Sequence, residues 1–303
     1  MTQTPAGPGR TGGQTGAGLI AGAPSLVPDD RFAAAYDATT PMQRGWLKTT
    51  VRYLFELHHD HRRGEATQSA SYAGGFAVSR LARPKDFALV LTPGPTAAPA
   101  RLLAAALPAL LAGVPEVAVA SLDGKLSGPA LTALELAGLE TALETTPARF
   151  AELVRGLGET SARGLILLLA PGALKPGIAA ALASSPNIEV WSAPPPRLAV
   201  LAAPRTRWDY AALALAHGGS PVEVYGPAPG ELPANCVPRP GGLAELLDAR
   251  PLAACLPHGL LRRALGSLPL ALGPGRETCF SWPTLRPALF ATRFLAVSGR
   301  APL

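Results

Sequence analysis

Cysteine is scarce in this sequence, and the few cysteines present exclude two kinds of site. The 303 residues include three, Cys236, Cys255 and Cys279. An odd number argues against a disulfide framework, and the intervals between them match no metal-binding pattern. The sequence also lacks a charged-then-apolar N-terminal signal and any apolar run near the roughly 20 residues of a membrane span. We therefore expect a soluble, reducing, cytoplasmic location and no membrane partner.

Two further absences concern nucleic acids and nucleotides. The net charge is +6 and the pI about 9.6, yet the arginines are scattered singly apart from small pairs such as Arg62-Arg63. No basic stripe with interleaved aromatic residues occurs, so no nucleic-acid partner is expected. Neither standard phosphate-binding loop occurs, because no GxGxxG follows a strand and neither GxxxxGKS nor GxxxxGKT is present.

What the sequence does contain is a series of strand-then-helix units. Residues 87–91 (FALVL) form a short unbroken apolar run, typical of a strand that is covered on both faces. A helix is predicted over 99–113, with leucines on one broad face and glycine as its C-cap. A second strand over 114–120 and a second helix over 128–138 follow. Strands that alternate with helices at this spacing imply right-handed crossovers onto a parallel sheet.

The alternation continues toward the C-terminus. Strands are predicted over 139–143, 164–170, 188–191, 198–202, 222–225 and 268–272, helices over 147–157, 177–183, 209–217, 243–249, 257–266 and 283–297, and a loop over 226–242. The predicted fold class is therefore α/β, with Rossmann-like parallel sheets flanked by helices. We expect two domains, 87–193 and 194–303, the second of which ends in the C-terminal helix.

The residues before the first predicted sheet are of two kinds. Residues 1–28 are mostly Gly, Thr, Ala and Pro, too poor in large apolar residues to offset the entropy of ordering, so a flexible tail is predicted. Residues 29–86 are expected to form helical and hairpin structure. Thr40 as the N-cap of a capping box predicts a helix over 41–59, and a hairpin arm is predicted over 72–81.

Two proline–glycine turns lie where an open α/β sheet usually places a ligand, at the carboxyl ends of strands. Pro93 and Gly94 follow the first predicted strand, and Gly172 follows the strand over 164–170. These three residues are the candidates for cofactor binding. As phosphate sites the turns are weak, because their prolines lack the backbone N–H that would donate to a phosphate.

Histidine and cysteine supply the candidate catalytic residues, each with a structural alternative. His258 lies near a helix start, where it could act as a general base. Cys279 could be a nucleophile if a positive neighbour lowered its pKa, and the alternative is a buried structural thiol. His217 and the histidine cluster at 58–61 each end a predicted helix, so these side chains either bind a metal or cap the helix dipole.

The order of these pieces resembles the histidinol dehydrogenases. In that family a Pro-Gly turn precedes a helix, a strand and a second helix, and a later helix carries a metal-binding histidine. The matching segments are 103–114 (LAAALPALLAGV), 116–119 (EVAV), 133–139 (ALELAGL), 193–202 (APPPRLAVLA), 209–218 (ending AHG) and 222–224 (VEV). The resemblance rests on the fact that these segments follow one another in the family's order over about residues 85–290.

The resemblance implies two Rossmann-like domains, often in a homodimer, and a reaction in which zinc orients histidinol and NAD accepts hydride in two steps. Carried over residue by residue, the site is incomplete. His217 matches the metal-binding histidine, but Ala214 stands where the family has glutamine. Pro257 replaces the glutamate before His258, and 265–275 holds no carboxylate for the metal-binding aspartate. Since zinc needs three or four ligands, zinc is not expected.

Two functions are therefore predicted as alternatives. In the first, the chain is a degenerate relative whose fold serves as a scaffold or binds a small molecule. In the second, it is an active NAD(P)-dependent oxidoreductase on another alcohol or aldehyde, with Cys279 or His258 carrying the chemistry without zinc. A third class, such as an acyl-group enzyme on a similar sheet, stays open because fold does not fix function.

Overall fold

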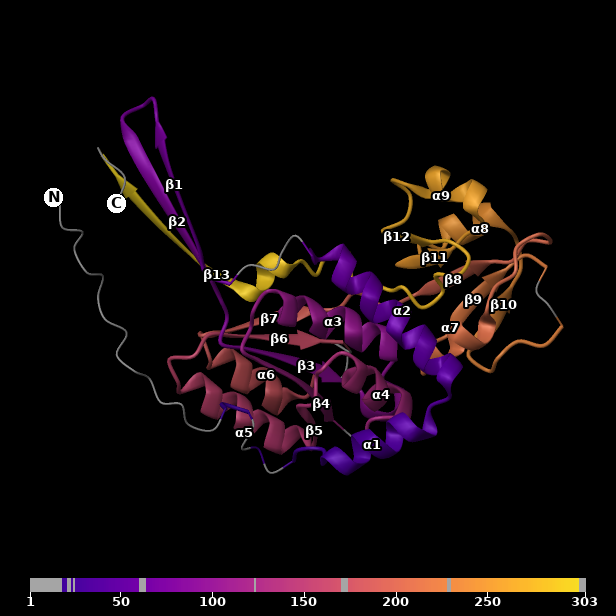
Figure 1. Ribbon diagram of the computed structural model, residues 1–303, viewed down its shortest axis with the longest axis horizontal. Helices are drawn as coiled ribbons and strands as arrows, with labels where there is room; N and C mark the ends of the chain where they lie inside the picture. Colours follow the sequence, from indigo (N-terminus) through magenta and orange to yellow (C-terminus); the bar gives the residue numbers. More distant parts are fainter. Residues whose placement is uncertain are drawn as a thin grey trace.

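Two five-stranded parallel sheets form the body of the protein (Figure 1). The computed structural model describes residues 18–20, 23, 25–59, 64–122, 124–169, 174–227 and 230–299. The first sheet holds β3 (Phe87–Thr92), β4 (Glu116–Leu122), β5 (Ala142–Thr145), β6 (Gly164–Leu168) and β7 (Ile188–Ser192). The second holds β8 (Leu198–Leu201), β9 (Val222–Tyr225), β10 (Cys236–Arg239), β11 (Ala253–Cys255) and β12 (Leu270–Leu272).

The two sheets share one strand order. The neighbours run β5-β4-β3-β6-β7 in the first sheet and β10-β9-β8-β11-β12 in the second. Every neighbouring pair is parallel. In chain order, β3 is the first strand of the first sheet and β8 is the first strand of the second, and each lies at the centre of its sheet. The direction of winding therefore switches beside β3 and beside β8. The predicted class, α/β with Rossmann-like parallel sheets, is confirmed.

Helices cover both faces of each sheet. They are α3 (Pro99–Leu111), α4 (Gly128–Leu136), α5 (Pro147–Gly158) and α6 (Pro176–Ala183) for the first sheet, and α7 (Tyr210–Ala216), α8 (Leu243–Asp248) and α9 (His258–Ala264) for the second. Among the described residues no helix is long and apolar enough to cross a bilayer.

The alternation of side chains along β3 explains why its run is unbroken. Phe87, Leu89 and Leu91 pack in one apolar cluster with α5 and α6, whereas Ala88 and Val90 pack in another with α3 and α4. Successive residues of a strand point to opposite faces, so both faces need apolar side chains when helices cover both.

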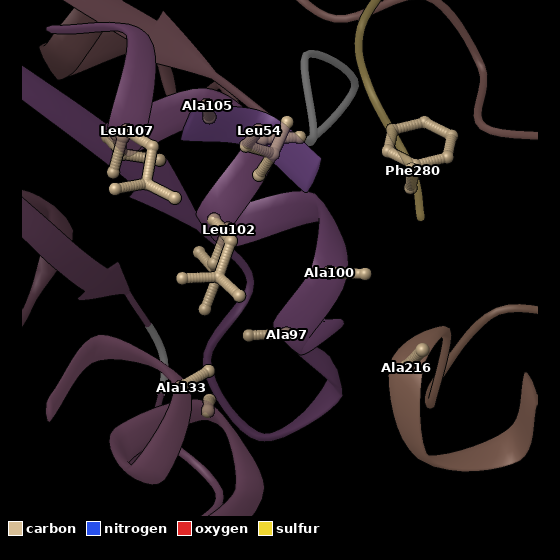
Figure 2. Packing of buried hydrophobic residues seen from close by; sticks show 14 of the residues in the cluster. Leu54, Ala97, Ala100, Leu102, Ala105, Leu107, Ala133, Ala216 and Phe280 are labelled. Atoms are coloured by element: carbon tan, nitrogen blue, oxygen red, sulfur yellow. The ribbon is translucent and has the colours of Figure 1, made fainter. Parts of the chain in front are cut away.

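Helix α3 lies at the junction of the two sheets. Every residue in it except Leu110 is buried. In Figure 2 Leu102 points toward Ala133 of α4, while Ala100 points to the side where Ala216 and Phe280 lie. Because one helix packs against both units, the two sheets share part of one apolar core.

The N-terminal helices follow the predicted start signal. Thr40 caps α2 (Pro41–Leu57), with its hydroxyl accepting from the N–H of Gln43 and the Gln43 side chain accepting from the N–H of Thr40. The helix α1 (Asp29–Ala38) precedes it. Helix α2 packs along α3 and also contacts α7, which links the N-terminal segment to both sheets.

The prediction of a flexible tail over residues 1–28 is wrong for the residues near its end that the structure describes. The N–H groups of Leu19 and Ile20 donate to the carboxylate of Glu116 at 2.7 and 2.9 Å, and Ile20 is fully buried. Leu26 forms an antiparallel bridge with Leu143 of β5. Backbone hydrogen bonds of Ser25 and Val27 to the edge strand β5, together with the burial of Ile20 and Val27 in the apolar clusters, hold the segment in place.

The predicted C-terminal helix over 283–297 is also wrong. A short 3-10 helix, η4 (Pro287–Phe290), leads into the strand β13 (Ala291–Ser298). This strand pairs antiparallel with β2 (Phe76–Pro84), which pairs in turn with β1 (Ala66–Tyr72) around the predicted hairpin. Eight residues of β13 pair with residues of β2. The local sequence pattern fits either a helix or a strand, and this non-local pairing decides for the strand.

A strand was not predicted within the loop over 226–242, yet β10 lies there. It pairs with β9 and forms an edge of the second sheet. Pro238 obscured the strand in the sequence, but an edge strand tolerates a residue that cannot donate to the ladder.

Candidate functional site

In the turn after β3, the first predicted ligand site, Pro93 is exposed and Gly94 is closely packed by protein atoms. Gly94 is buried, with φ of +64°, and a Cβ there would lie 2.8 Å from the hydroxyl oxygen of Ser121. A Cβ on Gly219 of the second unit would lie 2.5 Å from the carbonyl oxygen of Thr96. Pro93 begins the same turn, which is the 3-10 helix η2 (Gly94–Thr96). Gly172, the third candidate, lies outside the described residues.

His217 follows α7 and is fully buried between the two units. Its Nε2 lies 3.2 Å from the carbonyl oxygen of Glu277, so Nε2 carries the proton and donates. Its ring meets that of Phe280 edge to face, with centroids 5.8 Å apart. Burial, and then the charge of Arg101, lower the pKa of His217 to about 3. The imidazole is therefore neutral at physiological pH.

Arg101 of α3 reaches the same place from the first sheet. Its guanidinium donates to the carbonyl oxygen of Pro196 at 3.0 Å and to the hydroxyl of Ser220. It lies 5.9 Å from the centroid of Phe280, and burial lowers its pKa to about 10. No carboxylate forms an ion pair with it in the part of the chain that the structure describes. The junction beside His217 is therefore already cationic.

Cys279 lies in a buried environment that favours the neutral thiol. Burial raises its pKa to about 11, which outweighs the opposite effect of the nearby Arg276 charge. All three cysteines are free and buried. A thiol with a raised pKa is a poor nucleophile near neutral pH.

His258 begins α9 directly after β11 and is exposed. A Cβ on Gly273, which follows β12, would lie 3.3 Å from its ring, so His258 stands at the carboxyl edge of the second sheet. Helix α9 packs on the face that carries Leu201, and α7 packs on the opposite face with Val200. The two candidate histidines thus belong to helices on opposite faces of one sheet, and the fold does not bring them together.

The histidine cluster after α2 is only partly described. His58 is the C-cap of the helix, and Nδ1 of His59 donates to the carbonyl oxygen of Glu56 at 2.7 Å. Such a bond satisfies one of the last carbonyl groups of the helix. His61 lies outside the described residues. No group of three or more His, Cys, Asp or Glu side chains able to hold a metal occurs among the residues with described positions.

The sequence did not point to a crevice that lies between α2 and the carboxyl end of the second sheet. Its volume is about 480 Å³, and its lining residues are Trp46, Thr49, Arg207, Trp208, Asp209, Tyr210, Ala212, Gly275, Glu277 and Thr278. Its position beside β8 is the switch point of the second sheet, where open α/β sheets bind ligands. The one available signal was the turn after residues 198–202, which carries Arg207 and Asp209.

Glu277 is the buried carboxylate of this crevice, which we call the β8 crevice. The N–H groups of Gly275 and Asp209 donate to its Oε1, at 3.2 and 3.4 Å. No bond to its Oε2 occurs among the described residues. The side chain of Asp209 is occupied as the N-cap of α7, where it accepts from Ala212 at 2.9 Å. Glu277 is therefore the acidic group best placed to bind a cationic ligand.

Comparisons with known proteins concern the fold. No protein-family model and no curated protein matches the chain. The structure is similar to the histidinol dehydrogenase of Elizabethkingia anophelis, with a TM-score of 0.57 and 15% identity over 90% of this chain and 76% of that one. It also matches an apo indole-3-acetaldehyde dehydrogenase, with a TM-score of 0.44 and 10% identity over 89% and 85% of the two chains.

A third match is the Delta-pyrroline-5-carboxylate dehydrogenase of Mycobacterium tuberculosis, with a TM-score of 0.42 and 12% identity over 91% of this chain and 80% of that one. At these sequence identities, structural similarity is evidence for the fold alone. Only the match to the histidinol dehydrogenase, with its TM-score of 0.57, is used for that conclusion. The chain has an α/β fold similar to that of the Elizabethkingia anophelis histidinol dehydrogenase.

Proposed function

We propose that this chain is a histidinol-dehydrogenase-like protein that has lost the zinc-dependent oxidation site and uses its scaffold to bind a small molecule. The main support for the proposal is the complete burial of His217. This residue matches the family's metal-binding histidine, and here it is fully buried with Nε2 donating to a backbone carbonyl.

Zinc would meet two further obstacles at His217. The Arg101 guanidinium lies close enough to lower the pKa of the histidine, and the same positive charge opposes a bound cation. No set of three acidic, cysteine or histidine side chains occurs in the described ranges to complete a tetrahedral site. The residues described do not fit a zinc ion.

The β8 crevice is the place that we assign to the small molecule. Glu277 offers a carboxylate that two backbone N–H groups hold in position. Trp46 supplies an aromatic surface beside it, and Arg207 stands exposed on the wall. Carboxylates bind ammonium and imidazolium groups by charge-assisted hydrogen bonds, and aromatic rings bind cations on their faces. The ligand class is therefore a small molecule with a cationic group.

Zinc content and histidinol binding test the proposal together. We expect the purified chain to hold far less than one zinc per molecule, and we expect L-histidinol, used as a cationic probe, to bind without added metal in calorimetry. Glu277→Gln should weaken this binding by at least tenfold, whereas Glu152→Gln, on the exposed side of α5, should leave it unchanged. One zinc per chain, or NAD reduction that depends on zinc and histidinol, would contradict the proposal.

An NAD(P)-dependent oxidoreductase on another alcohol or aldehyde is the second candidate function. Its support is the dehydrogenase fold and the exposed His258 at the carboxyl edge of the second sheet, where a base could reach a substrate. Titration with NAD, NADH, NADP and NADPH, monitored by nicotinamide fluorescence, distinguishes the two candidate functions. Binding below millimolar cofactor together with hydride transfer to an aldehyde favours the oxidoreductase; no binding at millimolar cofactor removes it.

A further inference from the structure

A groove lies at the amino edge of the second sheet, at the opposite end of its strands from the β8 crevice. Its volume is about 560 Å³. The residues that line it come mainly from three segments, 194–197 before β8, 250–252 before β11 and 267–269 before β12. The register places the first residues of these three strands side by side, so the segments that lead into them meet at one edge. We call this place the amino-edge groove.

Prolines make up much of the wall of the amino-edge groove. They are Pro194, Pro195, Pro251 and Pro269, and Leu252 also lines it. A proline ring fixes the backbone angle φ at about −65°, so these segments hold their shape before a ligand arrives. A wall that is already ordered loses little conformational entropy on binding. The groove is therefore a preformed apolar surface.

Arg197 is one of two arginines in the groove, and its charge is already paired. Its guanidinium donates to the carbonyl oxygen of Ala249, at the end of α8, at 2.7 Å and to the carboxylate of Glu223 at 3.2 Å. Arg239 donates to the same carboxylate at 3.2 Å. Arg197 therefore ties the linker between the two sheets to α8 and is not a free cation.

Arg250 is the other arginine, and its backbone has a conformation that usually belongs to glycine. It follows Ala249, the C-cap of α8, and its φ is +48°. No other non-glycine residue with a described position has a positive φ. In this left-handed region a Cβ crowds the backbone, whereas glycine has none and commonly ends helices there. An arginine thus stands where glycine would fold with less strain, which indicates a use for its side chain.

The guanidinium of Arg250 is available to a ligand. The residue is exposed, and it forms no ion pair with Asp248 or any other carboxylate in the part of the chain that the structure describes. A guanidinium binds a carboxylate through two parallel hydrogen bonds. A free cation beside an apolar wall therefore complements a ligand with an anionic head and an apolar body.

We propose that the amino-edge groove binds a small carboxylate with an apolar aromatic or aliphatic body. The carboxylate lies on Arg250, and the body lies on Pro195, Pro269 and Leu252. The volume of the groove is within the range of about 300–1,000 Å³ that small-molecule sites occupy. One free guanidinium matches one carboxylate, whereas a strand of nucleic acid is bound by a row of cations.

This site is separate from the β8 crevice and takes the opposite charge. The two places lie at opposite ends of β8, whose 4 residues extend over about 10 Å. Glu277 offers a carboxylate to a cation in the crevice, and Arg250 offers a guanidinium to an anion in the groove. Both ligands can therefore bind at the same time.

Calorimetric titration of the full chain with 4-phenylbutyrate tests the proposal. We expect a dissociation constant below about 1 mM. The neutral amide of the same body, 4-phenylbutanamide, and acetate, which has the charge without the body, should each bind at least about tenfold more weakly. No binding of 4-phenylbutyrate up to about 10 mM, or an amide that binds as tightly as the acid, would overturn the proposal.

Two variants test the location of the probe. Arg250→Gln should weaken 4-phenylbutyrate binding by at least about tenfold, whereas Arg149→Gln, the same charge change on the exposed side of α5, should leave it unchanged. Ser267→Trp should block the groove with an indole ring, because Ser267 lines it and is exposed. Equal binding by the two glutamine variants, unchanged binding by Ser267→Trp, or competition with saturating L-histidinol would place the probe elsewhere and overturn the proposal.

Arg250→Gly separates a binding role from a structural one. Glycine relieves the strain of the positive φ, so we expect a higher melting temperature together with loss of 4-phenylbutyrate binding. An arginine that only supports the fold would give a lower melting temperature instead, and that result would overturn the proposal. Inorganic phosphate that binds more tightly than 4-phenylbutyrate, and only when Arg250 is present, would assign the groove to phosphate and overturn it as well.

Discussion

Arg101 and His217 meet on one aromatic ring, although they come from helices of different sheets. The guanidinium carbon lies 5.9 Å from the centroid of Phe280, and the imidazole centroid lies 5.8 Å from the same point. The cation and the neutral imidazole both face a buried ring, with no acidic partner for the cation among the described residues. This contact is part of the buried packing that joins the two units.

The first prediction concerns the ring itself. Phe280→Ala should lower the free energy of unfolding by about 3–5 kcal/mol, because it leaves a cavity where the two units meet. Urea unfolding of the full chain measures the change. Met42→Ala, at a side chain that is 64% exposed, serves as control and should stay within about 0.5 kcal/mol of the wild type. Equal losses in both variants would show that Phe280 is not central to the junction.

The second prediction concerns pH. The pKa of His217 is about 3 in the folded chain and about 6.5 in an unfolded chain. Between these values the unfolded state binds more protons, so stability should fall as pH drops below about 6.5, by up to about 1.4 kcal/mol per pH unit from this group. His217→Gln keeps a donor for the Glu277 carbonyl but cannot titrate.

Urea unfolding at pH 7.5, 6.5 and 5.5 therefore distinguishes the two chains. The free energy of unfolding should fall more for the wild type than for His217→Gln over this pH range. Because both chains have the same carboxylates, the contribution of these groups cancels when the two losses are subtracted. Parallel curves would mean that His217 titrates normally in the folded protein.

The third prediction concerns the candidate nucleophile. Because burial raises the pKa of Cys279 to about 11, the native chain should react with iodoacetamide at pH 7 at least a hundredfold more slowly than the urea-unfolded chain. Peptide mass spectrometry identifies the labelled cysteine. Rapid labelling of Cys279 alone in the native chain would restore its role as a nucleophile.

The fourth prediction compares two glycines. A Cβ on Gly164 would lie 2.0 Å from the ring of Phe87, so Gly164→Ala should destabilise the chain by about 2 kcal/mol or more. Nothing lies within 4 Å of a Cβ on Gly177 in α6, so Gly177→Ala should be neutral or stabilise by up to about 1 kcal/mol. Thermal unfolding of both variants gives the comparison, and a tolerated alanine at 164 would place the Phe87 ring elsewhere.

Much of this protein was determined by its local sequence. The run FALVL specified β3, because a strand covered on both faces needs apolar residues at every position. Thr40 and Gln43 specified the start of α2, because a capping box depends on residues three apart. The alternation of strands and helices then specified parallel sheets, since a crossover of this length permits little else.

Tertiary structure alone decided the rest. Residues 291–298 became a strand because β2 lay alongside to pair with them, and Ile20 is buried because it packs in an apolar cluster of the first sheet, where Glu116 also binds its backbone. Arg101 and His217 are 116 residues apart in the sequence, and Glu277 reaches Asp209 across a separation of 68 residues. Contacts between distant segments depend on the packing of whole elements, and no local pattern of residues encodes them.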